Sequence, residues 1–124
     1  RRWAREAIEK LDIRPPDINV QIGGLSGGNQ QKVVMARWLE RTPDVIILDN
    51  PTRGVDVGSK FAIYTLIREL SAKGVGIVLI SDDLSEVIGL SDRILALRDH
   101  RVISEIEANP AAKPSEAELV AQIV

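Results

Sequence analysis

Two short runs of apolar residues, each preceded by a helical segment, constrain the fold of this chain most. Residues 45–48 read Val-Ile-Ile-Leu, and residues 76–80 read Gly-Ile-Val-Leu-Ile. Continuous branched apolar runs of this length are typical of strands buried on both faces of a parallel sheet. Residues 29–40 and 57–72 have the apolar spacing of helices. The alternation of helix and strand predicts an α/β fold, a parallel sheet flanked by helices.

The rest of the chain is predicted to form shorter elements: a helix over 3–11, a capped helix ending near 90, a hairpin of 93–97 with 101–106, and a helix over 115–124. His100 is expected at the hairpin turn in a left-handed backbone conformation, with no catalytic role. The helix over 29–40 is apolar on most sides and is expected to be largely buried. Its predicted solvent stripe consists of Lys32, Arg37 and Arg41.

Composition excludes several classes of function. The 124 residues are 44% apolar and 27% charged, with a net charge of -2 and no block of Lys and Arg, so there is no electrostatic footprint for nucleic acid or anionic lipid. The lack of cysteine excludes disulfides and thiol–metal sites, and the single histidine argues against a histidine-built metal site. No apolar run approaches the roughly 20 residues of a membrane span, so any membrane link is expected through a partner.

Two features carry chemistry. The glycine-rich loop 23–28 opens the helix over 29–40, and free N–H groups at such a helix start favour phosphate. Asp49 ends the first apolar strand, where a carboxylate can hold Mg²⁺. Taken singly, each feature has a plainer interpretation: a glycine turn capped by Ser26, and a strand ending in a turn-forming aspartate.

Together the two motifs resemble one family. From Leu25 the chain reads Leu-Ser-Gly-Gly-Asn-Gln-Gln-Lys-Val, and from Leu48 it reads Leu-Asp-Asn-Pro-Thr-Arg-Gly-Val-Asp-Val-Gly. Both are similar to ATP-binding-cassette (ABC) ATPases, above all the C-terminal cassette of ribose, galactose and xylose importers. The resemblance implies the distal half of a P-loop NTPase fold. Residues 1–41 would end the helical subdomain, 42–107 would form the RecA-like core, and 108–124 the C-terminal linker and helix.

The resemblance also implies roles for single residues. The signature loop would clamp the γ-phosphate of ATP held by an opposing cassette through Ser26, Gly27, Gly28 and Asn29. Asp49 matches the Walker B aspartate, which holds Mg²⁺ through water. Asp56 matches the aspartate of the D-loop, which signals across the dimer interface.

Three departures from the family pattern matter. Position 50, usually the glutamate that activates water, is Asn50, which cannot accept a proton at neutral pH. Position 82, usually the switch histidine, is Asp82, whose charge would oppose the γ-phosphate. The site built on this cassette is therefore expected to be slow or silent. No Gly-x-x-x-x-Gly-Lys-Ser/Thr loop occurs, so the chain by itself is expected to bind ATP poorly and hydrolyse none.

The function that the resemblance implies is the ATP-binding subunit of a simple-sugar importer, an ATPase that uses ATP and Mg²⁺. It would lie peripherally on the cytoplasmic face of the bacterial inner membrane, with a second cassette, permease subunits and, indirectly, a sugar-binding protein as partners, and without nucleic acid. A chromosome-maintenance or DNA-repair ATPase is disfavoured by the acidic pI of 5.4 and the absence of heptads. A non-catalytic nucleotide sensor is favoured by Asn50 and Asp82, and stays open.

Overall fold

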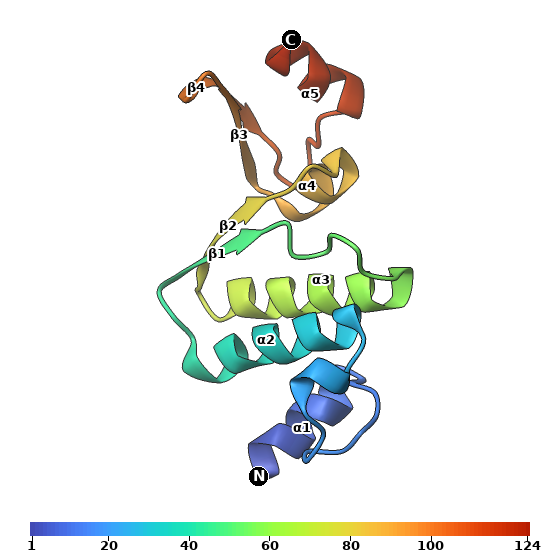
Figure 1. The fold of residues 1–124 in the computed structure, drawn as a ribbon. Coiled ribbons are helices and arrows are strands. Elements are labelled where there is room, and N and C mark those ends of the chain that lie inside the picture. Colours follow the sequence, from blue (N-terminus) through green and yellow to red (C-terminus); the bar gives the residue numbers. More distant parts are fainter. The chain divides into compact units, whose positions relative to one another are not determined.

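The computed structural model describes residues 1–124 and confirms the α/β architecture (Figure 1). Its elements, in chain order, are α1 (Arg2–Lys10), η1 (Ile22–Gly24), α2 (Gly27–Arg41), β1 (Val45–Asp49), α3 (Val57–Ala72), β2 (Gly76–Ile80), α4 (Leu84–Leu90), β3 (Arg93–Arg98), β4 (Arg101–Glu107) and α5 (Glu116–Ile123). The chain divides into two compact units, Arg1–Val78 and Leu79–Val124. No helix is both long enough and apolar enough to cross a bilayer.

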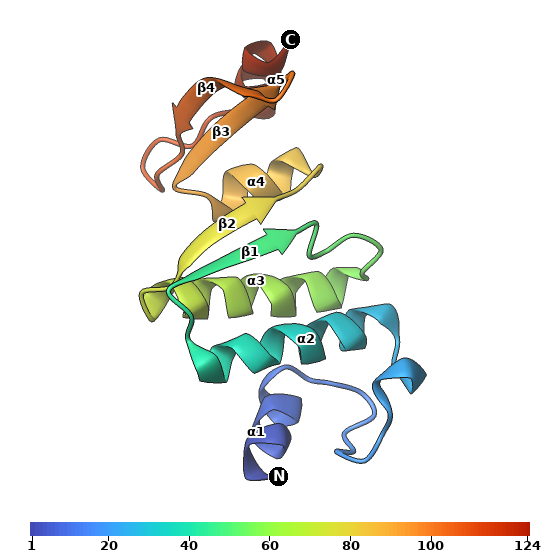
Figure 2. The ribbon, with the colours of Figure 1, turned by 60° about the vertical axis from the view of Figure 1, so that its left-hand side comes forward.

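In the first unit, α2 and α3 lie side by side, and α3 lies against the sheet (Figures 1 and 2). The buried side chains of α3 recur at helical spacing, which gives the helix one apolar face: Ile63, Leu66, Ile67 and Leu70. Asp56 caps the start of α3, and Gly74 follows its end with a φ of +89°. The predicted bounds of this helix are thereby confirmed at both ends.

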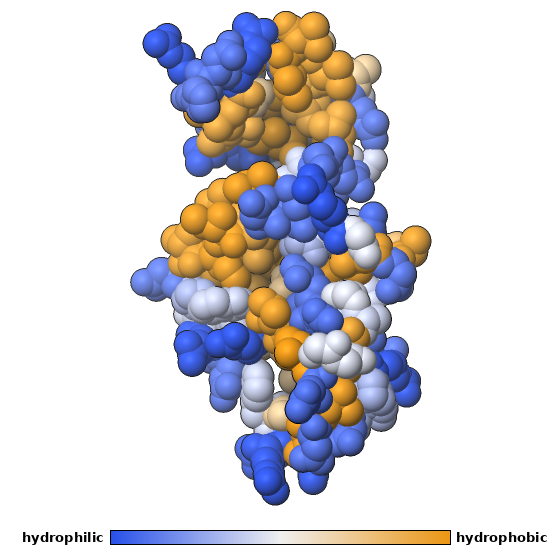
Figure 3. Space-filling view, in the orientation of Figure 1, coloured by the Kyte–Doolittle hydropathy of each residue, from blue (hydrophilic) through white to orange (hydrophobic).

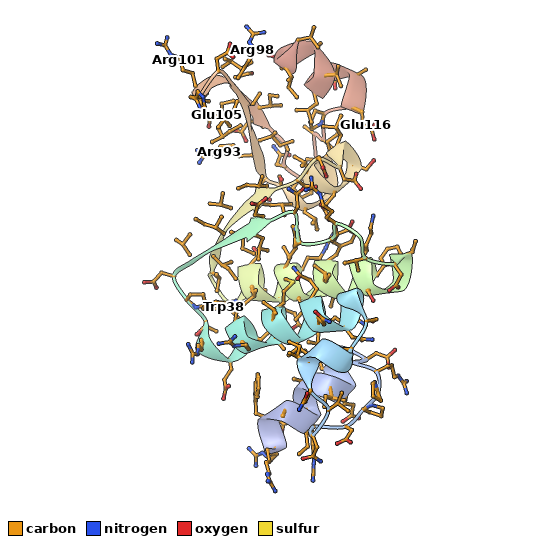
Figure 4. The ribbon with its side chains drawn as sticks, viewed as in Figure 1. Trp38, Arg93, Arg98, Arg101, Glu105 and Glu116 are labelled. Carbon is orange, nitrogen blue, oxygen red and sulfur yellow. The ribbon has the colours of Figure 1, made fainter.

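Two expectations for α2 are wrong. Val34 and Trp38 are 41% and 36% exposed, so the helix is not largely buried, and Figure 4 shows Trp38 near its C-terminal end. Lys32, placed in the solvent stripe from the sequence, is only 6% exposed. It shares the buried face of α2 with Met35 and Ala36. Its apolar stem is covered, and its ammonium group donates to the carbonyl oxygen of Asp12 at 3.1 Å.

β1 and β2 form a two-stranded sheet whose strands run in the same direction (Figure 2). Burial alternates along β1: Ile46 and Leu48 are buried, whereas Ile47 is 67% exposed. The prediction that this strand is buried on both faces is therefore wrong for these 124 residues, because no element of the chain covers the second face. With Val45 and Val78, Ile47 forms an apolar patch over the sheet (Figure 3).

The second unit is built on the β3–β4 hairpin. The strands are antiparallel, with Ile94 opposite Ile106 and a register shift after Ala96. One face packs on α4 and α5 around Ile94, Ala108 and Leu119. On the β3–β4 hairpin, Arg93 and Glu105 form an exposed ion pair at 3.2 Å (Figure 4).

Two local predictions hold in this unit. Asp99 and His100 make the hairpin turn with φ of +49° and +62°, which confirms the left-handed conformation expected for His100. The helix predicted over 115–124 is α5, and it begins with a capping box, because Ser115 Oγ accepts from Glu118 N–H and the Glu118 carboxylate accepts from Ser115 N–H.

Candidate functional site

The glycine loop becomes the first turn of α2. Ser26 is the N-cap, with extended backbone angles, and its Oγ accepts from the Asn29 N–H at 3.3 Å and from Asn29 Nδ2 at 2.9 Å. Gln30 Nε2 donates to the carbonyl oxygen of Leu25 at 2.9 Å and closes the turn. The N–H groups of the first helical turn, those of Gly27 and Gly28 among them, have no carbonyl partner within a helix. The turn therefore presents donors to any anion in front of it.

The two loop glycines have opposite surroundings. A methyl carbon built on Gly28 would lie 2.7 Å from Ser59 Oγ, 3.0 Å from Ser59 Cβ and 3.2 Å from Asp56 Oδ2. A methyl carbon built on Gly27 would meet nothing within 4 Å. Gly28 is therefore the contact at which α2 meets the start of α3, whereas Gly27 faces open space.

Asp56 caps the start of α3 beside the contact between Gly28 and Ser59. Its Oδ1 accepts from the Ser59 N–H at 2.9 Å, and its Oδ2 accepts from Ser59 Oγ at 2.9 Å. The hydrogen bond from the Ser59 backbone lowers the pKa of the Asp56 carboxyl most, followed by the bond from the Ser59 side chain, with a small contribution from the positive charge of Lys32. Asp56 is thus a stable anion and helix cap immediately beside Gly28.

A Ser59→Ala substitution is expected to raise the pKa of Asp56 toward its ordinary value of 3.8, because one of two donors is lost. A carboxyl whose pKa is lowered by folding stabilises the folded state above its unfolded pKa and loses that contribution as pH falls through the folded pKa. The variant should therefore lose the α3 cap at higher pH than the parent. A carboxyl ¹³C titration by NMR measures this, and an unchanged midpoint would remove the Ser59 side chain as a cause.

Asp49 and Asn50 stand together at the carboxyl end of β1. Asp49 is exposed, and Asn50, in a left-handed conformation with a φ of +46°, donates from Nδ2 to Asp49 Oδ1 at 3.0 Å. One exposed carboxylate suits Mg²⁺, which keeps most of its ligands as water and phosphate oxygen. No cluster of three or more potential metal-ligating side chains exists in the chain. Asn50 serves here as a hydrogen-bond donor, a role a carboxylate could not fill.

Asp82 belongs to the second unit and is itself exposed, in the turn between β2 and α4. The turn is ordered by its neighbours. Ser81 Oγ donates to the Glu86 carboxylate, and Asp83 caps α4 by accepting from the Glu86 N–H at 3.1 Å. The buried Glu86 was not singled out from the sequence. Only the five-residue distance from Ser81 to Glu86 could have pointed to it.

The structure joins candidate residues that the sequence keeps about 28 positions apart. The loop Ser26–Asn29 and Asp56 meet through Gly28, while Asp49 and Asn50 form a separate pair. Ser59 and Lys32 support the first group and were not predicted. The spacing of Asp56 and Ser59, three residues apart at a helix start, is a capping signal that could have identified Ser59.

Comparisons with known proteins show what the chain is similar to. A family profile described as ABC transporter matches residues 1–53, which include the glycine loop, Asp49 and Asn50. Over 118 residues the chain is 49% identical to the ribose import ATP-binding protein RbsA of Burkholderia pseudomallei (strain K96243), covering 95% of this chain and 23% of that protein. Over 110 residues it is 47% identical to the xylose import ATP-binding protein XylG of Geobacillus kaustophilus (strain HTA426), covering 89% and 22%.

The fold is similar to the crystal structure of a nucleotide-free ATP-binding cassette from an ABC transporter. The TM-score is 0.74 at 26% sequence identity, over 98% of this chain and 45% of that one. The chain belongs to the ATP-binding-cassette family. Its fold is that of the P-loop NTPase cassettes, as predicted. This ABC chain spans 23% and 22% of the length of the two importer proteins named above.

Proposed function

We propose that this chain is the distal part of the second cassette in the ATP-binding subunit of a simple-sugar importer, and that it supplies the signature loop to ATP held by the opposing cassette. The observation that carries the proposal is the open face of the first turn of α2. Gly27 has no neighbour within 4 Å of its missing side chain, while Gly28 behind it is packed against Ser59.

A phosphate can approach this turn closely because glycine puts no side chain in its path. The 15-residue helix α2 adds the positive end of its dipole, and the hydroxyl of Ser26 adds a donor. These groups would bind the terminal phosphate of a nucleotide and orient it for attack. They hold no proton-accepting group, so this face binds and positions without supplying a base.

The nucleotide site on this cassette's own side would be slow or silent. Asp49 would hold Mg²⁺ through water, and the ion would neutralise charge on the phosphate oxygens. Asn50 stands where a base would be needed, and its amide already donates to Asp49. Asp82 would add a like charge near the γ-phosphate. This pair of departures also supports a second candidate, a cassette that binds nucleotide as a sensor while another site hydrolyses it.

The wider setting follows from the same proposal. Residues 1–41 would end the helical subdomain, 42–107 would belong to the RecA-like core, and 108–124 would form the C-terminal extension. The whole subunit would act with a second cassette, permease subunits and a sugar-binding protein at the cytoplasmic face of the inner membrane. The 124 residues alone, without a phosphate-binding loop, would not hydrolyse ATP.

Replacing Ser26 with Ala in the full-length subunit should weaken binding of the triphosphate analogue AMP-PNP by about tenfold, the effect of one hydrogen bond to a charged acceptor. Binding of ADP should stay within about twofold, because ADP lacks the phosphate that the loop contacts. Isothermal titration with both nucleotides measures the two affinities. An equal loss for both would contradict the proposed contact.

A further inference from the structure

The hydroxyl oxygen of Ser26 accepts two hydrogen bonds from a single residue. The backbone N–H of Asn29 approaches it at 3.3 Å and the side-chain Nδ2 at 2.9 Å. A serine hydroxyl has two acceptor sites and one proton to donate. With both acceptor sites facing Asn29, the proton is left to point away from it, toward the open side of the turn.

The orientation of the Asn29 amide is set by a second contact. The backbone N–H of Arg14 lies 3.2 Å from Asn29 Oδ1. A backbone N–H can only donate, so the oxygen of the amide must face Arg14 and the nitrogen must face Ser26. The reverse orientation would set two donors against each other at Arg14.

The segment that carries Arg14 is itself held in place. Leu11 and Ile13 are each 4% exposed, and the buried Lys32 of α2 donates to the Asp12 carbonyl oxygen at 3.1 Å. Two hydrogen bonds between this segment and α2, one donated by Lys32 and one accepted by Asn29, therefore hold the Arg14 N–H in place.

We propose that Asn29 is a positioning residue that orients the Ser26 hydroxyl as a donor toward a terminal phosphate, with the Arg14 backbone determining the direction of the Asn29 amide. The inference rests on the proposed function, since it concerns how the same loop binds its nucleotide. It adds a specific requirement: position 29 must both accept a hydrogen bond from the 11–14 segment and donate one to Ser26.

The test is Asn29→Asp in the full-length subunit, with AMP-PNP and ADP as probes. A carboxylate would still accept from Arg14, but its other oxygen would accept the Ser26 proton and turn it away from the phosphate. AMP-PNP affinity should fall about tenfold, as for Ser26→Ala, while ADP affinity stays within about twofold. Asn29→Ala, which frees the hydroxyl to rotate, should give a smaller loss with the same selectivity.

Two controls separate orientation from charge. Gln31→Glu adds the same charge two residues further along the helix and should leave the AMP-PNP to ADP ratio within about twofold of the parent. In a Ser26→Ala background, Asn29→Asp should cause no further loss, because the two residues act through one hydroxyl. A further tenfold fall in that background would show direct repulsion by the charge and overturn the inference.

The remaining outcomes test either the inference about Asn29 or the proposed phosphate contact. Equal losses for AMP-PNP and ADP in both Asn29 variants would make the residue structural and overturn the inference. If Ser26→Ala changes the ratio and Asn29→Asp does not, the inference fails while the proposed function stands. If Ser26→Ala itself leaves the ratio unchanged, the proposed phosphate contact fails, whatever the Asn29 variants do.

Discussion

A Gly28→Ala variant of the full-length subunit is expected to lose about 1–3 kcal/mol of stability, the usual cost of adding a methyl group to a packed contact. The new carbon would lie 2.7 Å from Ser59 Oγ and 3.0 Å from Ser59 Cβ, so rotation of the hydroxyl alone cannot relieve the overlap. The Ser59 hydroxyl must turn away, which breaks its bond to Asp56 Oδ2, and α2 and α3 must also move apart to relieve the contact with Ser59 Cβ. The thermal unfolding temperature and the steady-state ATPase activity should both fall.

Gly27→Ala is the matched control, one residue away in the same turn. Its methyl group meets nothing within 4 Å, and alanine is the better helix former by about 1 kcal/mol, so stability should hold or rise. ATPase activity should still fall, because the methyl group occupies the space in front of the first turn. Equal losses of stability in both variants would contradict the packing described for Gly28.

In the full-length subunit, disabling the opposing cassette is expected to stop turnover almost completely. If the site with Asn50 lacks a base, the other site performs the hydrolysis. Replacing the water-activating glutamate of that other site with glutamine should then lower the rate by about 10²–10⁴-fold. ATP should remain bound, because binding depends on the phosphate contacts and not on the base. Steady-state ATPase activity with nucleotide retention on the purified protein measures both quantities.

Asn50→Asp is the converse test. Aspartate, like asparagine, tolerates the left-handed backbone at a φ of +46°, which glutamate does less readily, so the change isolates the carboxylate. The new carboxylate would lose the 3.0 Å bond to Asp49 and face a like charge. Turnover should therefore stay within about twofold of the parent, well short of the gain a working base gives.

Turnover that survives the glutamate replacement in the opposing cassette would show that the Asn50 site hydrolyses ATP.

The family and most of the secondary structure could be predicted from the sequence because their signals are local. A helix start needs an oxygen-bearing side chain within three residues, as at Asp56 and Ser115, and a left-handed turn needs a tolerant residue, as at Gly74 and His100. The strands at 45–49 and 76–80 follow from runs of branched apolar residues. The motifs around Ser26 and Asp49 also lie within a few residues, so they were recognisable without a structure.

Only the tertiary structure decided which faces meet. Helical spacing places Lys32 on a face of α2, but not whether that face lies against water or against the 11–14 segment. The packing of Gly28 on Ser59 joins residues 31 positions apart, and the Arg14–Asn29 bond joins residues 15 apart. The exposed face of β1 depends on what lies beside the strand. Contacts between distant segments depend on how several elements pack at once, and no local pattern contains that information.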